Sequence, residues 1–274
     1  MNEAFIIEKK NWGILGILIF FNLFFYWLLI NYGSLSSDDN RQIWAAVYQC
    51  LAFFGGFLGI FYSRIWGGHR SYIGRAVLIL SIGLLLQCFG QSVYSYFIFY
   101  QHIDVPYPSL GDVGFFGSVI AYIVAAAQFA KASGVSLRSK YFENKYGVFL
   151  IPLLMLVVTY FVFLTNYEFD WTNSTKIFLD FGYPFAEAIY VSIALLALIF
   201  CRNLLGGIMK GPIMFLLFAF IFQYFSDFMF LYQSNAGVWS AGGLNDLLYS
   251  ISYLLMTLGI IYIGQTYVKI KNTQ

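Results

Sequence analysis

The chain has 274 residues, of which 60% are hydrophobic and only 10% are charged. Because soluble domains carry about 25% charged residues, this composition excludes an ordinary water-soluble core. The formal net charge of +2 gives no indication of a nucleic-acid partner.

Apolar runs long enough to span a bilayer follow one another along the chain. The first run is too long for the hydrophobic region of a signal peptide and lacks a small-residue cleavage site, so we expect a retained helix. No segment between the runs is long enough for a soluble domain, so residues 1–274 are expected to form one transmembrane domain. The sequence therefore predicts an all-α polytopic membrane protein with eight helices, near residues 13–30, 43–62, 76–100, 112–132, 147–165, 176–201, 212–232 and 244–267.

The basic residues predict the orientation of these helices. Eight spans place both termini on one side of the membrane, and only Arg41 and Lys176 fall on the opposite side. Since cytoplasmic loops are enriched in Lys and Arg, we expect both termini in the cytoplasm and the protein in the cell membrane. The basic residues on the side of the termini are Lys9, Lys10, Arg64, Arg70, Arg75, Lys131, Arg138, Lys140, Lys145, Arg202, Lys210, Lys269 and Lys271.

The predicted helices pair into hairpins with a recurring junction. In three hairpins the second helix starts at an acid that is followed three residues later by an aromatic residue: Asp112 with Phe115, Asp180 with Tyr183, and Asp246 with Tyr249. The first two helices fit this pattern poorly. Ser109-x-x-Asp112 has the form of a capping box, and an acid at a helix N-terminus complements the helix dipole. We favour capping over direct ligand binding for these three acids.

A glycine motif predicts one close helix contact. The second predicted helix carries Gly55-x-x-x-Gly59, with Ala52 and Gly56 beside it. Small residues at this spacing allow two helix backbones to approach each other. We expect this motif to pack inside the bundle.

Two acids deeper in the helices are the strongest functional candidates. Glu187 lies two turns into its helix, on the face of Asp180 and Tyr183, and Asp227 lies in the outer half of the helix near 212–232. A charge at the bilayer centre costs on the order of 3 kcal/mol, and such residues are usually functional. No Lys or Arg lies deep enough to pair with either acid. Each must therefore be protonated, share a proton, accept hydrogen bonds from Tyr, Gln or water, or bind a cation.

Polar residues at similar depth supply candidate partners. Gln87 and Gln91 form a stripe on one helix, Gln223 precedes Asp227 by one turn, and Tyr253 continues the face of Asp246 and Tyr249. Together they predict a polar, aromatic-lined pocket open toward the outer side. A hydrogen-bond network that only joins the helices explains them equally well. The predicted ligand-binding residues are Asp112, Glu187, Asp227, Asp246, Gln91, Tyr183 and Tyr249.

The sequence lacks the residue patterns typical of metal binding, of a retinal Schiff base and of common enzyme families. His102, Asp104 and Asp170 lie in outer loops without metal-ligand spacing, so we predict no metal site. The absence of a deep lysine argues against a retinal Schiff base. No HExxH, GxSxG or P-loop motif occurs, so the sequence favours a non-enzymatic role and identifies no cofactor.

Four segments between residues 75 and 265 resemble a bacterial membrane family. Pro106-Tyr-Pro-Ser-Leu-Gly-Asp112-Val-Gly-Phe resembles the PYPSxADxxY segment of an eight-helix module, which forms the N-terminal sensor-type region of many diguanylate cyclase and phosphodiesterase (GGDEF/EAL) proteins. Its later segments resemble Gly182-Tyr-Pro-Phe-Ala-Glu187, Phe225-Ser-Asp227 and Gly242-Gly-Leu-Asn-Asp246-Leu-Leu-Tyr. Glu187 stands where the family usually has Asp, and Gly111 stands where it usually has Ala. The resemblance implies an outward-facing sensory or binding module, and we expect no GGDEF-type output domain in this chain.

Three functions remain open at this point. The first is a stand-alone sensor that binds a small molecule or ion in an outward-facing acidic pocket and signals through a separate cytoplasmic partner. The second is a small transporter in which Glu187 and Asp227 exchange protons or cations. The third is an intramembrane hydrolase in which paired carboxylates activate water. All three place the chain in contact with the lipid bilayer, and none involves nucleic acid.

Overall fold

The computed structural model describes residues 12–133, 146–165, 167–204 and 208–272. Five basic residues that the orientation prediction uses lie outside this part of the chain: Lys9, Lys10, Arg138, Lys140 and Lys145. The side chain of Arg202 also lies outside it.

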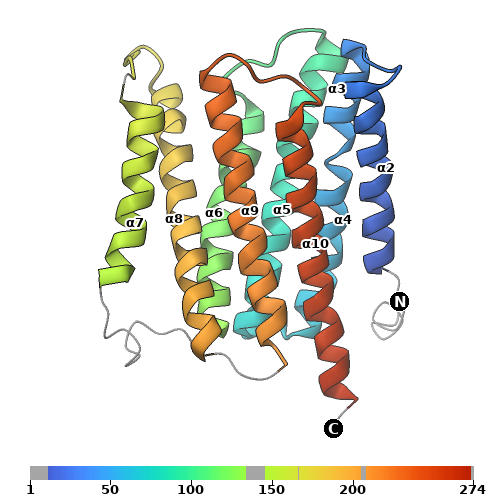
Figure 1. Ribbon diagram of the computed structural model, residues 1–274, viewed down its shortest axis with the longest axis vertical. Coiled ribbons are helices and arrows are strands. Elements are labelled where there is room, and N and C mark those ends of the chain that lie inside the picture. Colours follow the sequence, from blue (N-terminus) through green and yellow to red (C-terminus); the bar gives the residue numbers. More distant parts are fainter. Residues whose placement is uncertain (1–11, 134–145, 166, 205–207, 273–274) are drawn as a thin grey trace.

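The described residues form long helices that run up and down one bundle (Figure 1). This confirms the predicted all-α fold. Seven segments are long and apolar enough to cross a membrane, as expected for a multi-pass membrane protein. The helices are α2 (Trp12–Tyr32), α3 (Asp38–Val47), α4 (Cys50–Ile65), α5 (Tyr72–Tyr96), α6 (Leu110–Ala132), α7 (Tyr146–Thr159), α8 (Ser174–Leu204), α9 (Lys210–Asn235) and α10 (Leu244–Lys271), with π-helices at Phe97–Gln101 and Tyr160–Leu164 and a 3-10 turn at Gly68–Arg70.

The predicted span near 147–165 differs from the other seven. It corresponds to α7 and the π-helix that continues it, and its apolar part, Phe149–Leu164, is shorter than the other segments. The predicted span near 43–62 is also more complex, because α3 and α4 are separated by a turn at Tyr48 and Gln49. The two helices together still form one segment of membrane-spanning length, Asp38–Ile65.

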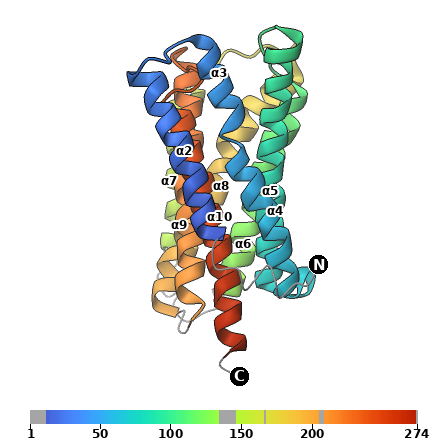
Figure 2. The same ribbon diagram turned by 90° about the vertical axis from the view of Figure 1, so that its right-hand side faces the viewer.

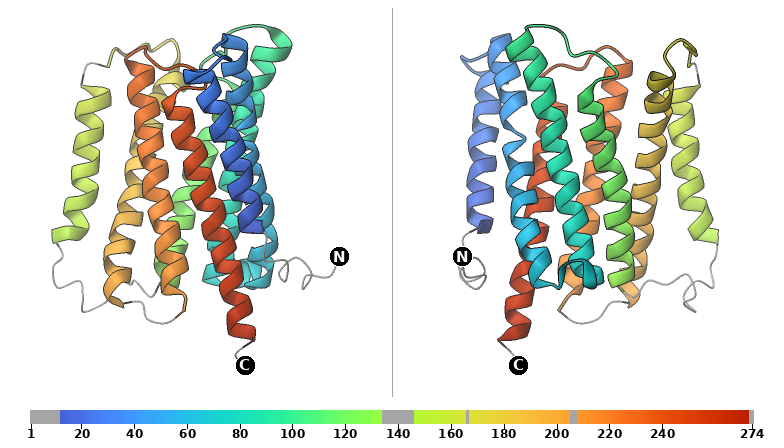
Figure 3. Two further views of the ribbon diagram at one scale, coloured as in Figure 1. Left: turned by 45° about the vertical axis from the view of Figure 1, so that its right-hand side comes forward. Right: turned by 180° about the vertical axis from the view of Figure 1, so that it is seen from behind.

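Six helices close into a ring. α4 packs against α5, α5 against α6, α6 against α8, α8 against α9, α9 against α10, and α10 against α4. Figure 3 shows α4, α5 and α6 side by side from behind, and Figure 2 shows the bundle edge-on. α2 packs on α10 and α7 on α8, so these two helices lie at the edges of the bundle.

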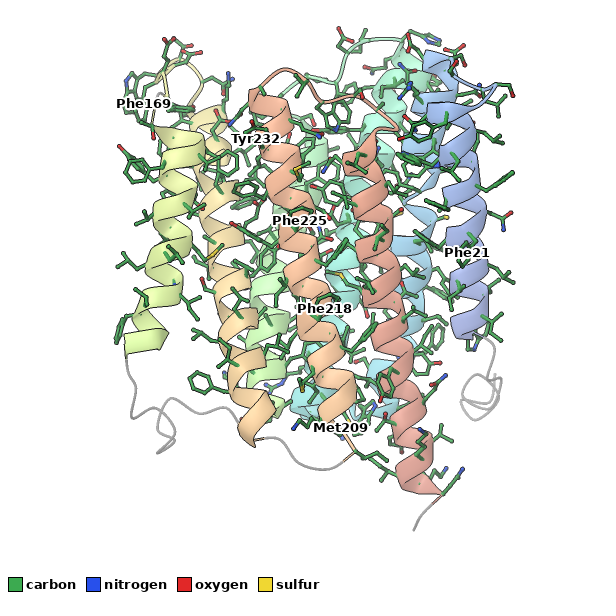
Figure 4. All side chains as sticks on the ribbon, viewed as in Figure 1. Phe21, Phe169, Met209, Phe218, Phe225 and Tyr232 are labelled. Carbon is green, nitrogen blue, oxygen red and sulfur yellow. The ribbon has the colours of Figure 1, made fainter. Side chains whose placement is uncertain are left out.

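The two ends of the bundle are distinct. We call the end with the loops 33–37, 102–109, 167–173 and 236–243 the outer end, which is at the top of Figure 1. The start of α2 and the end of α10 lie at the opposite, inner end. Phe21, Phe218 and Phe225 point away from the bundle and are about half exposed (Figure 4), as expected for side chains in contact with lipid.

The glycine motif packs inside the bundle, as predicted. A Cβ atom at Gly55 would collide with the hydroxyl of Thr257 on α10, and one at Gly59 would collide with the hydroxyl of Ser81 on α5. α4 can therefore approach both neighbours only because these positions lack a side chain. Glycine also joins α5 to α6, because a Cβ at Gly114 would lie 2.7 Å from the backbone nitrogen of Gly90.

Candidate functional site

Asp227 lies inside the ring and accepts hydrogen bonds from neutral donors. Its side chain is 5% exposed. The Tyr190 hydroxyl of α8 donates to Oδ2 at 2.6 Å, and Gln223, one turn earlier on α9, donates through Nε2 to Oδ1 at 2.9 Å. Tyr249 of α10 interacts electrostatically with this carboxylate. Donors from α8 and α9 thus converge on Asp227, and such donors favour the charged form of a carboxyl group.

Glu187 is the second buried acid, and its surroundings differ. It lies on α8 with 4% of its surface exposed and interacts electrostatically with Asp227. Within the described part of the chain, no hydrogen bond to the Glu187 carboxyl group is found, and Asp227 is the acid with which it interacts. The sequence analysis singled out both acids, and the structure brings them together on adjacent helices.

Tyrosine hydroxyls surround the two acids. Six tyrosines interact electrostatically with Asp227 from the α3–α4 junction, α6, α8, α9 and α10: Tyr48, Tyr122, Tyr190, Tyr224, Tyr249 and Tyr253. Glu187 shares Tyr190, Tyr224 and Tyr249 with Asp227. Tyr190 was not predicted as a site residue, although it follows Glu187 by three residues and so lies on the same helix face.

A chain of amide and hydroxyl groups extends this acid centre across the ring. Ser252 of α10 donates to Oε1 of Gln223 at 2.6 Å. On the other side, Tyr253 donates to Oε1 of Gln87 at 3.2 Å, and Nε2 of Gln87 donates to the Ser118 hydroxyl of α6 at 2.7 Å. Four helices, α5, α6, α9 and α10, are therefore joined by neutral polar groups at the level of the acids.

The Tyr122 hydroxyl is an exception in this network. It lies beside Gln87, yet it completes no hydrogen bond with any described residue. The Gln87 amide forms its hydrogen bonds with Ser118 and Tyr253 instead. A buried hydroxyl without a partner destabilises the folded state.

Asp112 and Asp246 both lie in the first turn of their helices and accept backbone hydrogen bonds there. Asp112 completes the predicted capping box, since its Oδ2 accepts from the Ser109 backbone N–H at 2.7 Å while the Ser109 side chain accepts from the start of α6. Its Oδ1 also accepts from the Tyr183 hydroxyl of α8 at 3.1 Å. Asp246 accepts from the backbone N–H of Gly242 at 2.8 Å and so fixes the loop before α10.

Asp180 is not at a helix N-terminus, and that prediction was wrong. α8 begins at Ser174, because Asn173 accepts a hydrogen bond from the backbone N–H of Lys176 at 3.0 Å and caps the helix. Asp180 lies almost two turns further in. Its two oxygens accept from the hydroxyls of Tyr107 and Tyr167, both at 2.7 Å.

These hydrogen bonds join two outer loops to α8. Tyr107 belongs to the loop between α5 and α6, and Tyr167 to the loop between α7 and α8. Burial first, and the hydrogen bond to Asp180 second, raise the pKa of Tyr167 to about 12. The same two causes raise the pKa of Tyr107. Both hydroxyls therefore keep their protons at neutral pH and remain donors to Asp180.

Gln91 lies away from the acids. Its Nε2 donates to the backbone carbonyl of Ala45 at 2.9 Å, at the point where the turn between α3 and α4 interrupts the helical hydrogen bonds. Gln49 caps the next carbonyl, that of Ala46, at 2.7 Å. Gln91 thus compensates for a helix break at membrane depth, where an unpaired carbonyl is costly.

Glu187 and Asp227 are both buried in this structure. Two surface hollows of about 360 and 500 Å³ lie near the outer end, and neither is lined by Glu187 or Asp227. The first is lined by Phe169, Ile177, Phe178, Phe181, Gly182 and Phe185, and the second by Gln42, Ile98, His102, Ile103 and Asp104. Toward the inner end, the ring is filled by apolar side chains without exposed surface: Leu80, Leu84, Phe129, Ile213, Leu216, Leu217, Phe220 and Ile260.

This arrangement limits the chemistry of the site. The described residues contain no group of three or more His, Cys, Asp or Glu side chains that could hold a metal ion. Structural and catalytic zinc sites need three or four such ligands. Two acids with neutral partners can instead hold a proton, share one, or bind a single small cation.

Comparisons of the chain with protein-family models, with curated proteins and with solved structures gave no match.

Proposed function

We propose that the chain is a membrane sensor module that binds a small ion, a proton or a cation, at Glu187 and Asp227. The observation that supports this is the burial of two carboxyl groups on adjacent helices with no basic partner among the described residues. Two ionised carboxylates at this depth repel each other and lack hydration, so an added proton or cation stabilises them. Its binding would change how tightly α8 and α9 pack, and a sensor requires such a coupling between occupancy and conformation.

The interior of the ring favours a sensor over a transporter. A transporter must expose its site alternately to both sides of the membrane. On the outer side of Asp227, further polar groups follow, among them Asp112 and Tyr183. The inner half of the ring is instead filled by large apolar side chains such as Phe129 and Leu217. Access from one side is sufficient for sensing, and this asymmetry ranks transport second. A hydrolase would further need room for a substrate beside the acids.

We further propose that the span near 147–165 crosses the membrane, which gives eight spans and cytoplasmic termini in a cell membrane. The helix from Tyr146 through Leu164 is about 28 Å long at 1.5 Å per residue, close to the hydrocarbon thickness of about 30 Å. Basic residues of the described chain support the orientation, because Arg41 and Lys176 are at the outer end and seven others at the inner end. Those seven are Arg64, Arg70, Arg75, Lys131, Lys210, Lys269 and Lys271. The inner loops would then carry the signal to a separate cytoplasmic partner, in keeping with the resemblance to bacterial sensor modules.

Ion-dependent stability tests the proposed binding. The full chain in lipid nanodiscs would be unfolded by heat at several pH values and with added Na⁺, K⁺ or Ca²⁺. An ion present at 100 times its Kd should stabilise the fold by about 2.7 kcal/mol, and the effect should saturate. Glu187→Gln and Asp227→Asn should remove this dependence, whereas Asp104→Asn, in an outer loop, should preserve it. A wild-type midpoint that responds to no ion and to no change of pH would overturn the proposal.

Flux measurements separate the sensor from the transporter. Proteoliposomes loaded with a pH-sensitive or cation-sensitive dye would be given a gradient of the ion that stabilises the protein. The sensor proposal predicts no flux above that of protein-free liposomes. Flux that disappears in Glu187→Gln would instead identify the chain as a transporter.

A further inference from the structure

Four polar residues line one face of α8 from the outer end to the acid centre. Asp180, Tyr183, Glu187 and Tyr190 follow each other at intervals of three and four residues, which places them on one side of the helix. Ten residues separate the first from the last, so the row is about 15 Å long. Every position in this row carries a group that can accept or donate a proton.

The outer end of this row reaches the solution side. Tyr107, which donates to Asp180, is 43% exposed. Tyr167 donates to the other oxygen of Asp180, so two loop tyrosines cover this carboxylate. One turn deeper, Tyr183 donates to Asp112 and thereby also joins α8 to the N-terminus of α6.

The inner end of the row shows which acid is charged. Asp227 accepts from Tyr190 and Gln223, and these donors stabilise a carboxylate. Glu187 receives no hydrogen bond from a described residue, and a buried carboxyl group without donors is far less costly when it is neutral. The geometry therefore assigns the negative charge to Asp227 and a proton to Glu187.

Apart from Asp227, the surrounding groups do not provide a base that would compete for this proton. The six tyrosines that face Asp227 are neutral at physiological pH, and α5 contributes the uncharged Gln87. A metal cation fits less well than a proton, because it requires several free oxygen lone pairs. Both oxygens of Asp227 already accept N–H or O–H donors, whose hydrogens would face the cation.

We propose that the ion sensed by this chain is a proton, which Glu187 takes up from the outer side along the Asp180–Tyr183 face of α8. This inference rests on the proposed sensor function. In the step itself, a hydronium ion at the outer surface transfers its proton to Asp180 and leaves water, and the proton passes on to form the O–H bond of Glu187. Tyr107 and Tyr167 cover the outer end of this route and limit the rate of uptake.

Infrared spectroscopy of the full chain in nanodiscs tests the identity of the ion. Acidification from a high pH at which Glu187 is ionised should produce the C=O stretching band of a protonated buried carboxyl group. The band should be absent in Glu187→Gln and retained in Asp104→Asn, a control that removes an outer carboxylate away from the row. If no such band appears, and stability depends instead on Na⁺, K⁺ or Ca²⁺, the proton assignment is overturned while the sensor proposal stands. If stability depends on neither pH nor these cations, both proposals fail.

The kinetics of the same band test the route. After a rapid drop in pH, Asp180→Asn should delay the appearance of the Glu187 band by about 100-fold, the magnitude typical for loss of a proton-transfer group. The double variant Tyr107→Phe, Tyr167→Phe keeps the carboxylate but removes both covering hydroxyl groups, so uptake should be faster than in the wild type. This second variant also serves if Asp180→Asn does not fold. Wild-type kinetics in the variants that fold would overturn the route through Asp180.

Discussion

Tyr190 and Tyr122 form a matched pair that tests the energetics of the acid centre. Both are fully buried, and their rings pack edge to face with centroids 6.0 Å apart. The Tyr190 hydroxyl donates to Asp227 at 2.6 Å, whereas the Tyr122 hydroxyl has no hydrogen-bond partner among the described residues. Replacement of either residue by phenylalanine removes only one oxygen atom. The difference between the two variants therefore isolates the hydrogen bond to Asp227.

The expected effects differ in sign. Tyr190→Phe removes a hydrogen bond to a charged acceptor, which contributes about 1.5 to 3 kcal/mol, so it should destabilise the protein by that amount. Tyr122→Phe removes a buried hydroxyl that makes no hydrogen bond, so it should leave stability unchanged or raise it by up to about 1 to 3 kcal/mol.

Reversible unfolding of the purified chain in mixed detergent micelles, followed by circular dichroism, would measure both free energies of unfolding. The wild type and the two variants would be compared under the same conditions. Equal effects of the two substitutions would refute the assignment of Asp227 as the charged, hydrogen-bonded member of the pair.

Three further substitutions test the packing and the caps in the same unfolding assay. Gly55→Ala should lower the free energy of unfolding by about 1 to 3 kcal/mol, because its Cβ would collide with α10. Gly16→Ala is the control and should leave stability unchanged, because a Cβ there makes only an ordinary contact at 3.5 Å. A similar loss at both positions would contradict the close approach of α4. Gln91→Leu leaves the Ala45 carbonyl unpaired and should cost about 1 to 3 kcal/mol; an unchanged free energy would show that this carbonyl finds another donor. Ser109→Ala should lose about 0.5 to 2 kcal/mol by removing the capping box, and a neutral effect would show that the cap does not stabilise α6.

Much of the fold follows from the sequence because the lengths of the apolar runs define membrane helices. The turn between α3 and α4 could not be predicted in this way. No proline or glycine lies at Tyr48 and Gln49, and the break is stabilised by Gln91 from a different helix. Gln91 was expected near the acids, and its contact with Ala45 depends on which helices are neighbours. Periodicity within one helix does not contain that information.

The candidate site was predictable only in part, because the sequence does not show which helices are neighbours. The depth of Glu187 and Asp227 in their helices follows from the sequence alone. Their proximity in the folded protein depends on the packing of α8 against α9. The position of Asp180 was misjudged because the apolar run starts after Lys176, while the cap of the helix is the polar residue Asn173. Polar first turns extend a membrane helix beyond its hydrophobic part, so runs of apolar residues underestimate its length.

A double-mutant cycle between Glu187→Gln and Asp227→Asn, measured by unfolding over a range of pH, tests most directly whether the two acids form one centre. Ionisation of Glu187 near the charged Asp227 places two negative charges on buried side chains of neighbouring helices, so the interaction should grow as pH rises. The account predicts a coupling energy of about 0.5 to 3 kcal/mol at high pH that becomes smaller in acid. Effects that add to within about 0.3 to 0.5 kcal/mol at every pH would show that the two acids act independently and would contradict it.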